Sequence, residues 1–422
     1  MSSDPVPNVA LGAKAWFVWG LSVTFVIYYF SFQTGYSISN PKVQADLSLT
    51  VNQVATVAAI YTWVFALCQF VSGAMLDRLG AGRIIPISIL IVTVGVFLFA
   101  NAQSYSMLLL SQLVFAVGAC SGFVGAGYVG GQWFGMARFS FMFGLVQFAA
   151  SFFSAFNQSL LVFALDQWSW RALFNGIGVL GIVLFILGAM FIRNPRPVVR
   201  PPESFGAFMA NVFSGIGVVF RIPHVLLASA YGALCFGVML GLGVVWAPKL
   251  LIQRGFDTSA ANWSAALLWL GLAIGCMVIP KWSDAIGRRK LPMIAGISIQ
   301  LAAFIALLYT PGLNQAAAMA LCLVFGFGNA SHMLAFSTAA DVVAPEQIGT
   351  SAAIVNGAMF IFGGIMISRP GVRIGLGLEE GLDPTSLDFA QYVSIPALVA
   401  LAVAFILSLV IRETYPVHRS AE

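Results

Sequence analysis

The stretch GAMLDRLGAGR, residues 73–83, decides how the whole chain is interpreted. Its eleven residues include one aspartate, two arginines and three glycines, whereas charged residues make up only 8% of the protein. A second stretch with a similar layout, PKWSDAIGRRK, follows at residues 280–290. The two stretches share an aspartate and a glycine: Asp77 and Gly80 in the first, Asp284 and Gly287 in the second. Two such loops, about half a chain apart, predict a duplicated membrane unit.

The composition is that of a protein that crosses a membrane many times. Hydrophobic residues make up 60% of the chain and aromatic residues 13%, and the mean hydropathy is +0.93, which excludes a soluble globular domain. The five cysteines are odd in number and scattered through apolar segments, so they indicate neither disulfides nor a metal site. The net charge of +5 is typical of basic loops in membrane proteins and does not indicate nucleic-acid binding.

Twelve apolar runs are long enough to cross a membrane, because a spanning helix needs about 20 residues. The interval at residues 193–222 is rich in proline and arginine and separates six runs from six. We therefore predict an all-α membrane protein with twelve transmembrane helices in two six-helix bundles, residues 1–192 and 223–422, joined by a linker at 193–222. The predicted spans are 16–37, 53–76, 83–102, 106–134, 138–163, 170–192, 223–251, 259–281, 290–310, 315–340, 347–370 and 390–411.

The basic residues predict the orientation of these spans. Alternate loops divide the 20 Lys and Arg residues into fourteen on the side of both termini and six on the other side. Because basic loops stay in the cytoplasm, both termini, the linker and both aspartate-containing loops are predicted to be cytoplasmic. The expected location is the cell inner membrane.

With these features the chain resembles the major facilitator superfamily of secondary transporters over nearly its whole length. The loop that this family carries after helix 2 is matched by Gly73, Asp77, Arg78, Gly80 and Arg83, and a weaker copy after helix 8 by Asp284, Gly287 and Arg288. The resemblance implies two bundles that rock around a central cavity, with these eight residues acting in gating. Gln112 stands where many proton-driven members carry an arginine, which argues against drug efflux.

The loop after helix 2 also has an expected partner. A negative charge is favoured at a helix N-terminus, so we expect Asp77 to meet the start of helix 11 near Gly349. The resemblance implies that this contact holds the bundles together while the cavity faces outward.

Ionisable groups deep in a membrane are costly and usually functional. All fifteen Asp and Glu residues lie in loops, tails or helix ends. His332 is the ionisable side chain near the middle of a span, and Asn329, three residues earlier, shares its helical face. Two interpretations stay open for His332: a substrate contact or proton-sensitive group, or a neutral histidine hydrogen-bonded between helices.

Two polar stripes run along predicted helices. Helix 1 carries Ser22, Tyr29, Gln33 and Tyr36, and helix 5 carries Gln147, Ser151, Ser154 and Gln158. Such stripes do not face lipid; they either line a wet cavity, which we favour, or bond neighbouring helices. Tyr61 and Trp269 are further candidates because they fall near the middle of their spans.

Two bases interrupt apolar runs on the outer side, Lys249 near the end of helix 7 and Arg369 near the end of helix 11. They could attract an anion into an outward-open mouth. The alternative is that both side chains reach to the membrane interface as long bases commonly do.

Together these features predict a transporter that moves a small polar organic solute, preferably an organic anion or zwitterion, by alternating access. The expected partners are that solute, the lipid bilayer and a coupling proton or counter-substrate, with the chain acting as a monomer. No metal-ligand spacing or nucleophile pattern is present in the sequence, so we expect no cofactor, no metal and no enzyme activity. Export of hydrophobic compounds and a membrane scaffold without transport are the alternatives.

Overall fold

The computed structural model describes residues 12–195 and 204–415. Within these ranges the chain is helical nearly throughout, with no strand. Eleven helices there are long and apolar enough to span a membrane, and α6 adds the shorter apolar stretch Phe139–Phe153. All twelve predicted spans therefore fall on helices.

The described part of the first half contains seven α-helices and one 3₁₀ turn, at Met136–Arg138. Thr50 and Gln53 form a capping box that starts α2, and Gly80 ends it with a φ of 77°, a conformation that favours glycine. The predicted fourth span is broken at Cys120 and Ser121 into two helices. The helices are α1 (Ala13–Asp46), α2 (Val51–Leu79), α3 (Ala81–Ala100), α4 (Tyr105–Ala119), α5 (Gly122–Phe134), α6 (Phe139–Gln167) and α7 (Trp170–Phe191).

The second half is more interrupted. A π-helical segment at Leu242–Trp246 divides the predicted seventh span, and a 3₁₀ turn at Ala330–His332 divides the tenth. The α-helices are α9 (Pro223–Gly241), α10 (Ala247–Gln253), α11 (Thr258–Ile286), α12 (Lys290–Tyr309), α13 (Gln315–Asn329), α14 (Met333–Ala340), α15 (Ile348–Glu379) and α16 (Leu387–Val410). Helices α1 and α15 run nine residues beyond the predicted ends at 37 and 370.

The predicted linker is not wholly polar, because residues 205–220 form the apolar helix α8 (Phe205–Phe220). Ser204 caps its first turn by accepting a hydrogen bond from the amide of Ala207. The guanidinium of Arg78 donates to the carbonyl of Asn211 at 3.0 Å, which ties α8 to the end of α2.

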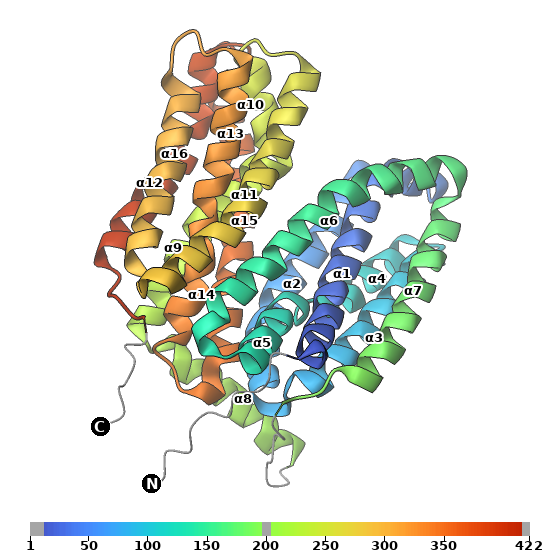
Figure 1. Ribbon diagram of the computed structural model, residues 1–422. Helices are drawn as coiled ribbons and strands as arrows, with labels where there is room; N and C mark the ends of the chain where they lie inside the picture. Colours follow the sequence, from blue (N-terminus) through green and yellow to red (C-terminus); the bar gives the residue numbers. More distant parts are fainter. Residues whose placement is uncertain (1–11, 196–203, 416–422) are drawn as a thin grey trace.

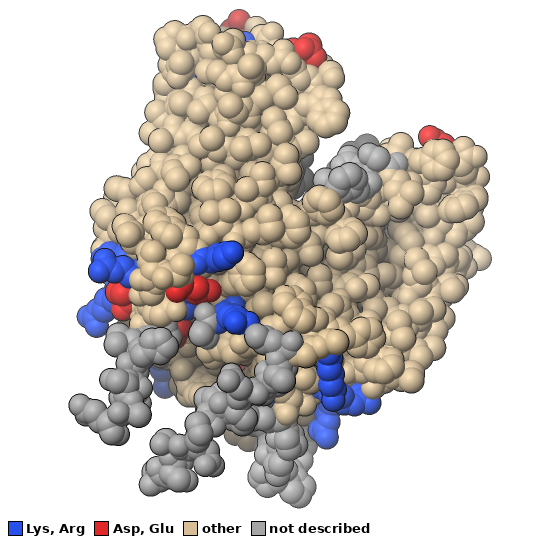
Figure 2. All heavy atoms as spheres, in the orientation of Figure 1, with Lys and Arg blue, Asp and Glu red and all other residues tan. Residues whose placement is uncertain are grey.

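The helices form two groups that touch at one end and diverge at the other (Figure 1). Figure 2 shows that the visible Lys and Arg side chains gather mainly at the end where the halves meet. We call this end the base-rich face; it carries the loops with Arg78, Arg138 and Arg288. The opposite end, where the halves part, is the open face. The limits 1–192, 193–222 and 223–422 stay our proposed boundaries of the two bundles and linker.

Candidate functional site

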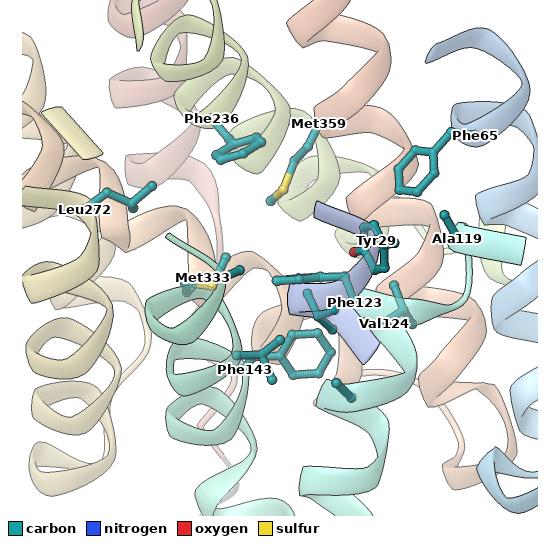
Figure 3. Packing of buried hydrophobic residues seen from close by; sticks show 14 of the residues in the cluster. Tyr29, Phe65, Ala119, Phe123, Val124, Phe143, Phe236, Leu272, Met333 and Met359 are labelled. Atoms are coloured by element: carbon teal, nitrogen blue, oxygen red, sulfur yellow. The ribbon is translucent and has the colours of Figure 1, made fainter. Parts of the chain in front are cut away.

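A small cavity lies between the two halves, where the divergence ends. It measures about 60 Å³, enough for water molecules. Figure 3 shows Phe236, Met359, Met333, Tyr29 and Phe123 around it. Helices from both halves line it with Tyr29, Phe30, Phe123, Gln147, Phe236, Leu240, Trp269, His332, Met333, Asn356, Met359 and Phe360.

The cavity lies near the middle of the membrane-spanning layer. Gln147 is eight residues from the start of α6, Asn356 eight from the start of α15 and His332 eight from the end of α14. All three helix ends lie at the base-rich face. At 1.5 Å per residue, the three side chains are about 12 Å from that face, close to the midplane of a hydrocarbon core roughly 30 Å thick.

The imidazole of His332 has a defined orientation. Within the 3₁₀ turn the amide of Met333 bonds to the carbonyl of Ala330, so it does not take the carbonyl of Asn329 as in an α-helix. Nδ1 of His332 lies 2.7 Å from that carbonyl oxygen. A carbonyl only accepts, so Nδ1 carries the proton and the neutral ring presents a lone pair at Nε2.

Three buried polar atoms at the cavity lack a hydrogen-bond partner within the described residues: the hydroxyl oxygen of Tyr29, Nε2 of His332 and Nδ2 of Asn356. Their side chains are at most 3% exposed, and an unpaired buried polar atom costs about 1–3 kcal/mol. Nε2 offers an acceptor, Nδ2 a donor and the hydroxyl either, so a ligand with hydroxyl and carboxyl groups could satisfy all three.

Four of the predicted substrate contacts line this cavity: Tyr29, Gln147, Trp269 and His332. Ser151 stands behind Gln147, whose Nε2 donates to its hydroxyl at 3.0 Å. The side chains of Ser154 and Gln158, predicted on the same stripe, lie outside what the structure describes.

The other predicted contacts lie away from the cavity lining. Nε2 of Gln33 is 3.5 Å from Oε1 of Gln112, and Asn329 donates to the carbonyl of Cys235 at 2.8 Å. Tyr36 and Tyr61 pack against Phe99 and Phe65. These contacts fit the alternative of helix bonding and packing. Lys249 and Arg369 are exposed; their roles in substrate binding stay predictions.

Sequence reasoning missed Asn356 and the aromatic lining. Asn356 interrupts the apolar run AAIVNGAMFIF, so a search for every polar residue within the spans, and not only for ionisable ones, would have found it. Phe123, Phe236 and Phe360 had no such signal, because a phenylalanine facing a cavity and one facing lipid look alike in sequence.

An aromatic layer separates the cavity from the base-rich face. Phe143 of α6 and Phe336 of α14, one helical turn nearer that face than Gln147 and His332, stack with centroids 4.7 Å apart. Phe123 lies 5.8 Å from each of them. Ser140, three residues nearer the base-rich face than Phe143, is hydrogen-bonded across the halves to Ser337, which follows Phe336. The path from the cavity to the base-rich face is therefore closed by packed side chains.

Asp77 closes the same face between α2 and α15. Its Oδ1 accepts from the amide of Gly349 and its Oδ2 from the amide and hydroxyl of Thr350, each at 2.7 Å. These amides begin α15, where the helix dipole favours a negative charge. The predicted contact near Gly349 is thus present, while its role in gating stays a prediction.

The second loop makes a related contact between α11 and α6. Asp284 accepts from the amide of Phe141, at the start of α6, and also from Nη1 of Arg289 at 2.6 Å. Nε of Arg289 donates to Asp341 at 3.2 Å. We predicted Arg288 as the base of this loop, but Arg288 is exposed and Arg289 is fully buried. The sequence could not distinguish two adjacent arginines.

The C-terminal segment covers this loop. Glu413 accepts from the amides of Arg289 and Lys290 at 2.7 and 3.1 Å, and the hydroxyl of Tyr415 donates to the carbonyl of Asp284 at 3.2 Å. Gly287 ends α11 in the left-handed region with a φ of 62°, matching the role of Gly80. Arg83 is exposed at the start of α3.

We expect Asp77→Asn to slow transport several-fold without abolishing ligand binding. The amide keeps one acceptor oxygen but loses the charge and turns an NH₂ group toward backbone donors, which weakens charge-assisted hydrogen bonds. Uptake by reconstituted vesicles and ligand-induced thermal shifts measure the two properties separately. Loss of binding in a variant that still folds would contradict a purely gating role.

Comparison with known proteins identifies the family. Residues 21–368 match the family model of the Major Facilitator Superfamily. The probable galactarate/D-glucarate transporter GudP of Bacillus subtilis (strain 168) is 24% identical over 76% of this chain and 77% of its own length. The probable sulfoacetate transporter SauU of Cupriavidus necator is 22% identical, with 83% and 87% covered.

Among solved structures, the transporter FucP in its outward conformation is similar with a TM-score of 0.70. It is 16% identical, and the similarity covers 94% of this chain and 99% of FucP. At this identity the likeness concerns the fold. Because the family model matches most of the sequence, the protein described here belongs to the Major Facilitator Superfamily of transmembrane transporters.

Proposed function

We propose that this protein carries a small organic acid anion across the inner membrane by exposing one central cavity to each face in turn. The observation that supports this best is a mid-depth cavity with three unpartnered polar atoms, closed toward the base-rich face by Asp77 and the aromatic layer. Alternating access needs such a site, with one side closed while the other is open.

The relatives support the class of substrate. GudP is named for galactarate and D-glucarate and SauU for sulfoacetate, and all three are organic acids. The base-rich face is the cytoplasmic one in our orientation, so the conformation described here faces outward. We therefore propose uptake or exchange rather than export.

A thermal-shift series on the purified protein tests this proposal. We expect D-glucarate, galactarate, D-gluconate or sulfoacetate to raise the melting temperature, since a ligand at 100 times its Kd adds about 2.7 kcal/mol to stability. Neutral sugars and choline serve as controls. Stabilisation by hydrophobic compounds alone would favour the exporter, and no response to any compound would favour the scaffold.

We expect the double variant Lys249→Gln, Arg369→Gln to take up organic anions more slowly, mainly at low salt. Nζ of Lys249 lies 4.4 Å from the centre of the Trp246 ring, and Trp246 donates to the carbonyl of Ile367 at 3.0 Å, two residues before Arg369. The indole thus links the two helix segments that carry these exposed bases. Beyond the cavity, we expect their positive charges to attract anions at long range, an effect that salt screens.

The uptake rate measured at low and high ionic strength checks this prediction. Lys281→Gln, which removes an exposed base near the base-rich face, is the matched control. Equal rates and equal salt dependence in the double variant and the control would mean that the two bases only anchor their helices at the interface.

A further inference from the structure

The central cavity must hold an anion without a permanent positive charge. Among the described residues, the twelve that line it include no Lys, Arg, Asp or Glu. Lys249 and Arg369 are exposed and outside this lining. Moving an isolated carboxylate from water into such a place costs several kcal/mol unless a positive charge accompanies it. The neutralising charge therefore has to arrive with the substrate.

His332 is placed to receive that charge. Its Nδ1 proton is held by the carbonyl of Asn329 at 2.7 Å, so an additional proton can bind only at Nε2. That atom is buried and unpartnered, on a side chain that lines the cavity. The protonated ring would donate from Nε2, and Nδ2 of Asn356 is a second donor across the same space.

Among the described residues, the surroundings of His332 hold no competing charge. The buried titratable groups on the packed helices are Tyr231 and Cys235 on α9, Cys276 on α11 and Tyr28, Tyr29 and Tyr36 on α1, all of which are neutral at pH 7. His224 lies at the base-rich end of α9. The hydroxyl of Tyr231 is hydrogen-bonded to the carbonyl of Met293 and to the hydroxyl of Ser331. Helices α6 and α15 present Gln147 and Asn356, which do not titrate.

The charged groups of these helices lie at their ends or, for Arg369 and Arg373 of α15, at least three turns beyond Asn356 toward the open face. Asp341 is nine residues from His332 along α14, which is about 13 Å, and it is paired with Arg289. Asp284 is paired with the same arginine. No carboxylate of the described chain is therefore near enough to hold a proton on His332 when the cavity is empty.

We propose that a carboxylate binds in this cavity together with one proton, which enters from the open face and sits on Nε2 of His332. This inference rests on the proposed function and adds that anion transport is coupled to a proton. The empty cavity keeps His332 neutral, and the bound pair of carboxylate and imidazolium has no net charge. A monocarboxylate thus crosses without moving charge, and a dicarboxylate crosses with one negative charge.

Calorimetry on the purified full-length protein tests the proton directly. Binding of D-gluconate, D-glucarate or sulfoacetate is measured at one pH in two buffers that differ in ionisation enthalpy, because the difference in heat gives the number of protons taken up. We expect about one proton per bound anion in the unmodified protein. His332→Gln and His332→Asn should bind the anion more weakly and take up no proton, while His224→Gln, at the base-rich end of α9, should behave as the unmodified protein.

Each result has one meaning. Binding without proton uptake in the unmodified protein overturns this inference and leaves the proposed function standing. Proton uptake that persists in both His332 variants also overturns it, because the proton then resides on the substrate. If none of the three acids binds to folded protein, the proposed function fails and this inference fails with it. Melting temperatures without ligand confirm that each variant is folded.

Discussion

Replacing Gly73 by alanine is expected to open the base-rich face. A Cβ atom at this position would lie 2.2 Å from the carbonyl oxygen of Gly349 and 2.4 Å from Cβ of Ala353. The first of these is backbone at the start of α15 and cannot move aside as a flexible side chain would. Relief requires α2 and α15 to separate, which is the movement that alternating access needs at this face.

The expected shift between the two conformations follows from the free-energy cost of overpacking. An added methyl group in a well-packed contact costs about 1–3 kcal/mol, which corresponds to a shift of roughly 5- to 150-fold between two conformations. The variant should therefore populate the conformation that is open at the base-rich face, and uptake should fall because the cycle is unbalanced.

Spin labels at two exposed positions of the base-rich face, Arg138 and Glu346, measure the opening as a longer distance between the halves. Gly364→Ala is the matched control: it lies in α15, and its added Cβ atom would meet nothing within 4 Å, so it changes helix propensity alone. An unchanged distance distribution in Gly73→Ala would refute the assignment of this contact as the closing one.

Replacing Arg289 by methionine should destabilise the protein strongly. The guanidinium is fully buried and pairs with Asp284 at 2.6 Å and Asp341 at 3.2 Å. Removing one member of a buried ionic group costs about 3–5 kcal/mol because the remaining charges are left unpaired. Arg288→Met, one residue away and exposed, is the control and should stay within about 0.5 kcal/mol of the unmodified protein.

The loss should depend on pH. Burial raises the pKa of the Asp341 carboxyl from 3.8 to about 6, although Arg289 opposes this shift. A carboxyl whose pKa is higher in the folded than in the unfolded protein stabilises the fold at a pH below its unfolded-state pKa. That stabilisation is lost as the pH rises through its folded-state pKa. Without Arg289 the pKa of Asp341 rises further. The melting temperature of Arg289→Met should therefore fall further below that of the unmodified protein at pH 8 than at pH 5. An equal loss at both values would show that packing, not charge, dominates.

The sequence was sufficient for the features that repeat or that carry charge. Apolar runs of about 20 residues predicted all twelve spans, and the aspartate of the loop at residues 73–83 predicted the contact with Gly349. The sequence was insufficient where an α-helix gives way to a 3₁₀ or π-helical segment. The 3₁₀ turn at Ala330–His332 continues the apolar pattern of its neighbours, so the orientation of His332 could not be predicted from spacing.

Tertiary packing decided the rest of the candidate site. Tyr29 and Gln147 reach the cavity, while Tyr36 and Gln33, on the same predicted stripe as Tyr29, pack or bond elsewhere. Over several turns, the polar face of one helix packs against more than one neighbouring helix. Only some of its side chains therefore reach the same cavity. Arg289 was overlooked for a similar reason, because burial depends on how α12 begins.

Helix α8 packs the linker against both halves. It contacts both α2 and α15, with Phe70 and Phe220 5.6 Å apart between ring centres and Arg78 bound to Asn211. If α2 and α15 separate, α8 has to leave at least one of them. We therefore expect the contacts of α8 with the two halves to slow the opening of the base-rich face, although α8 contributes no residue to the lining of the cavity.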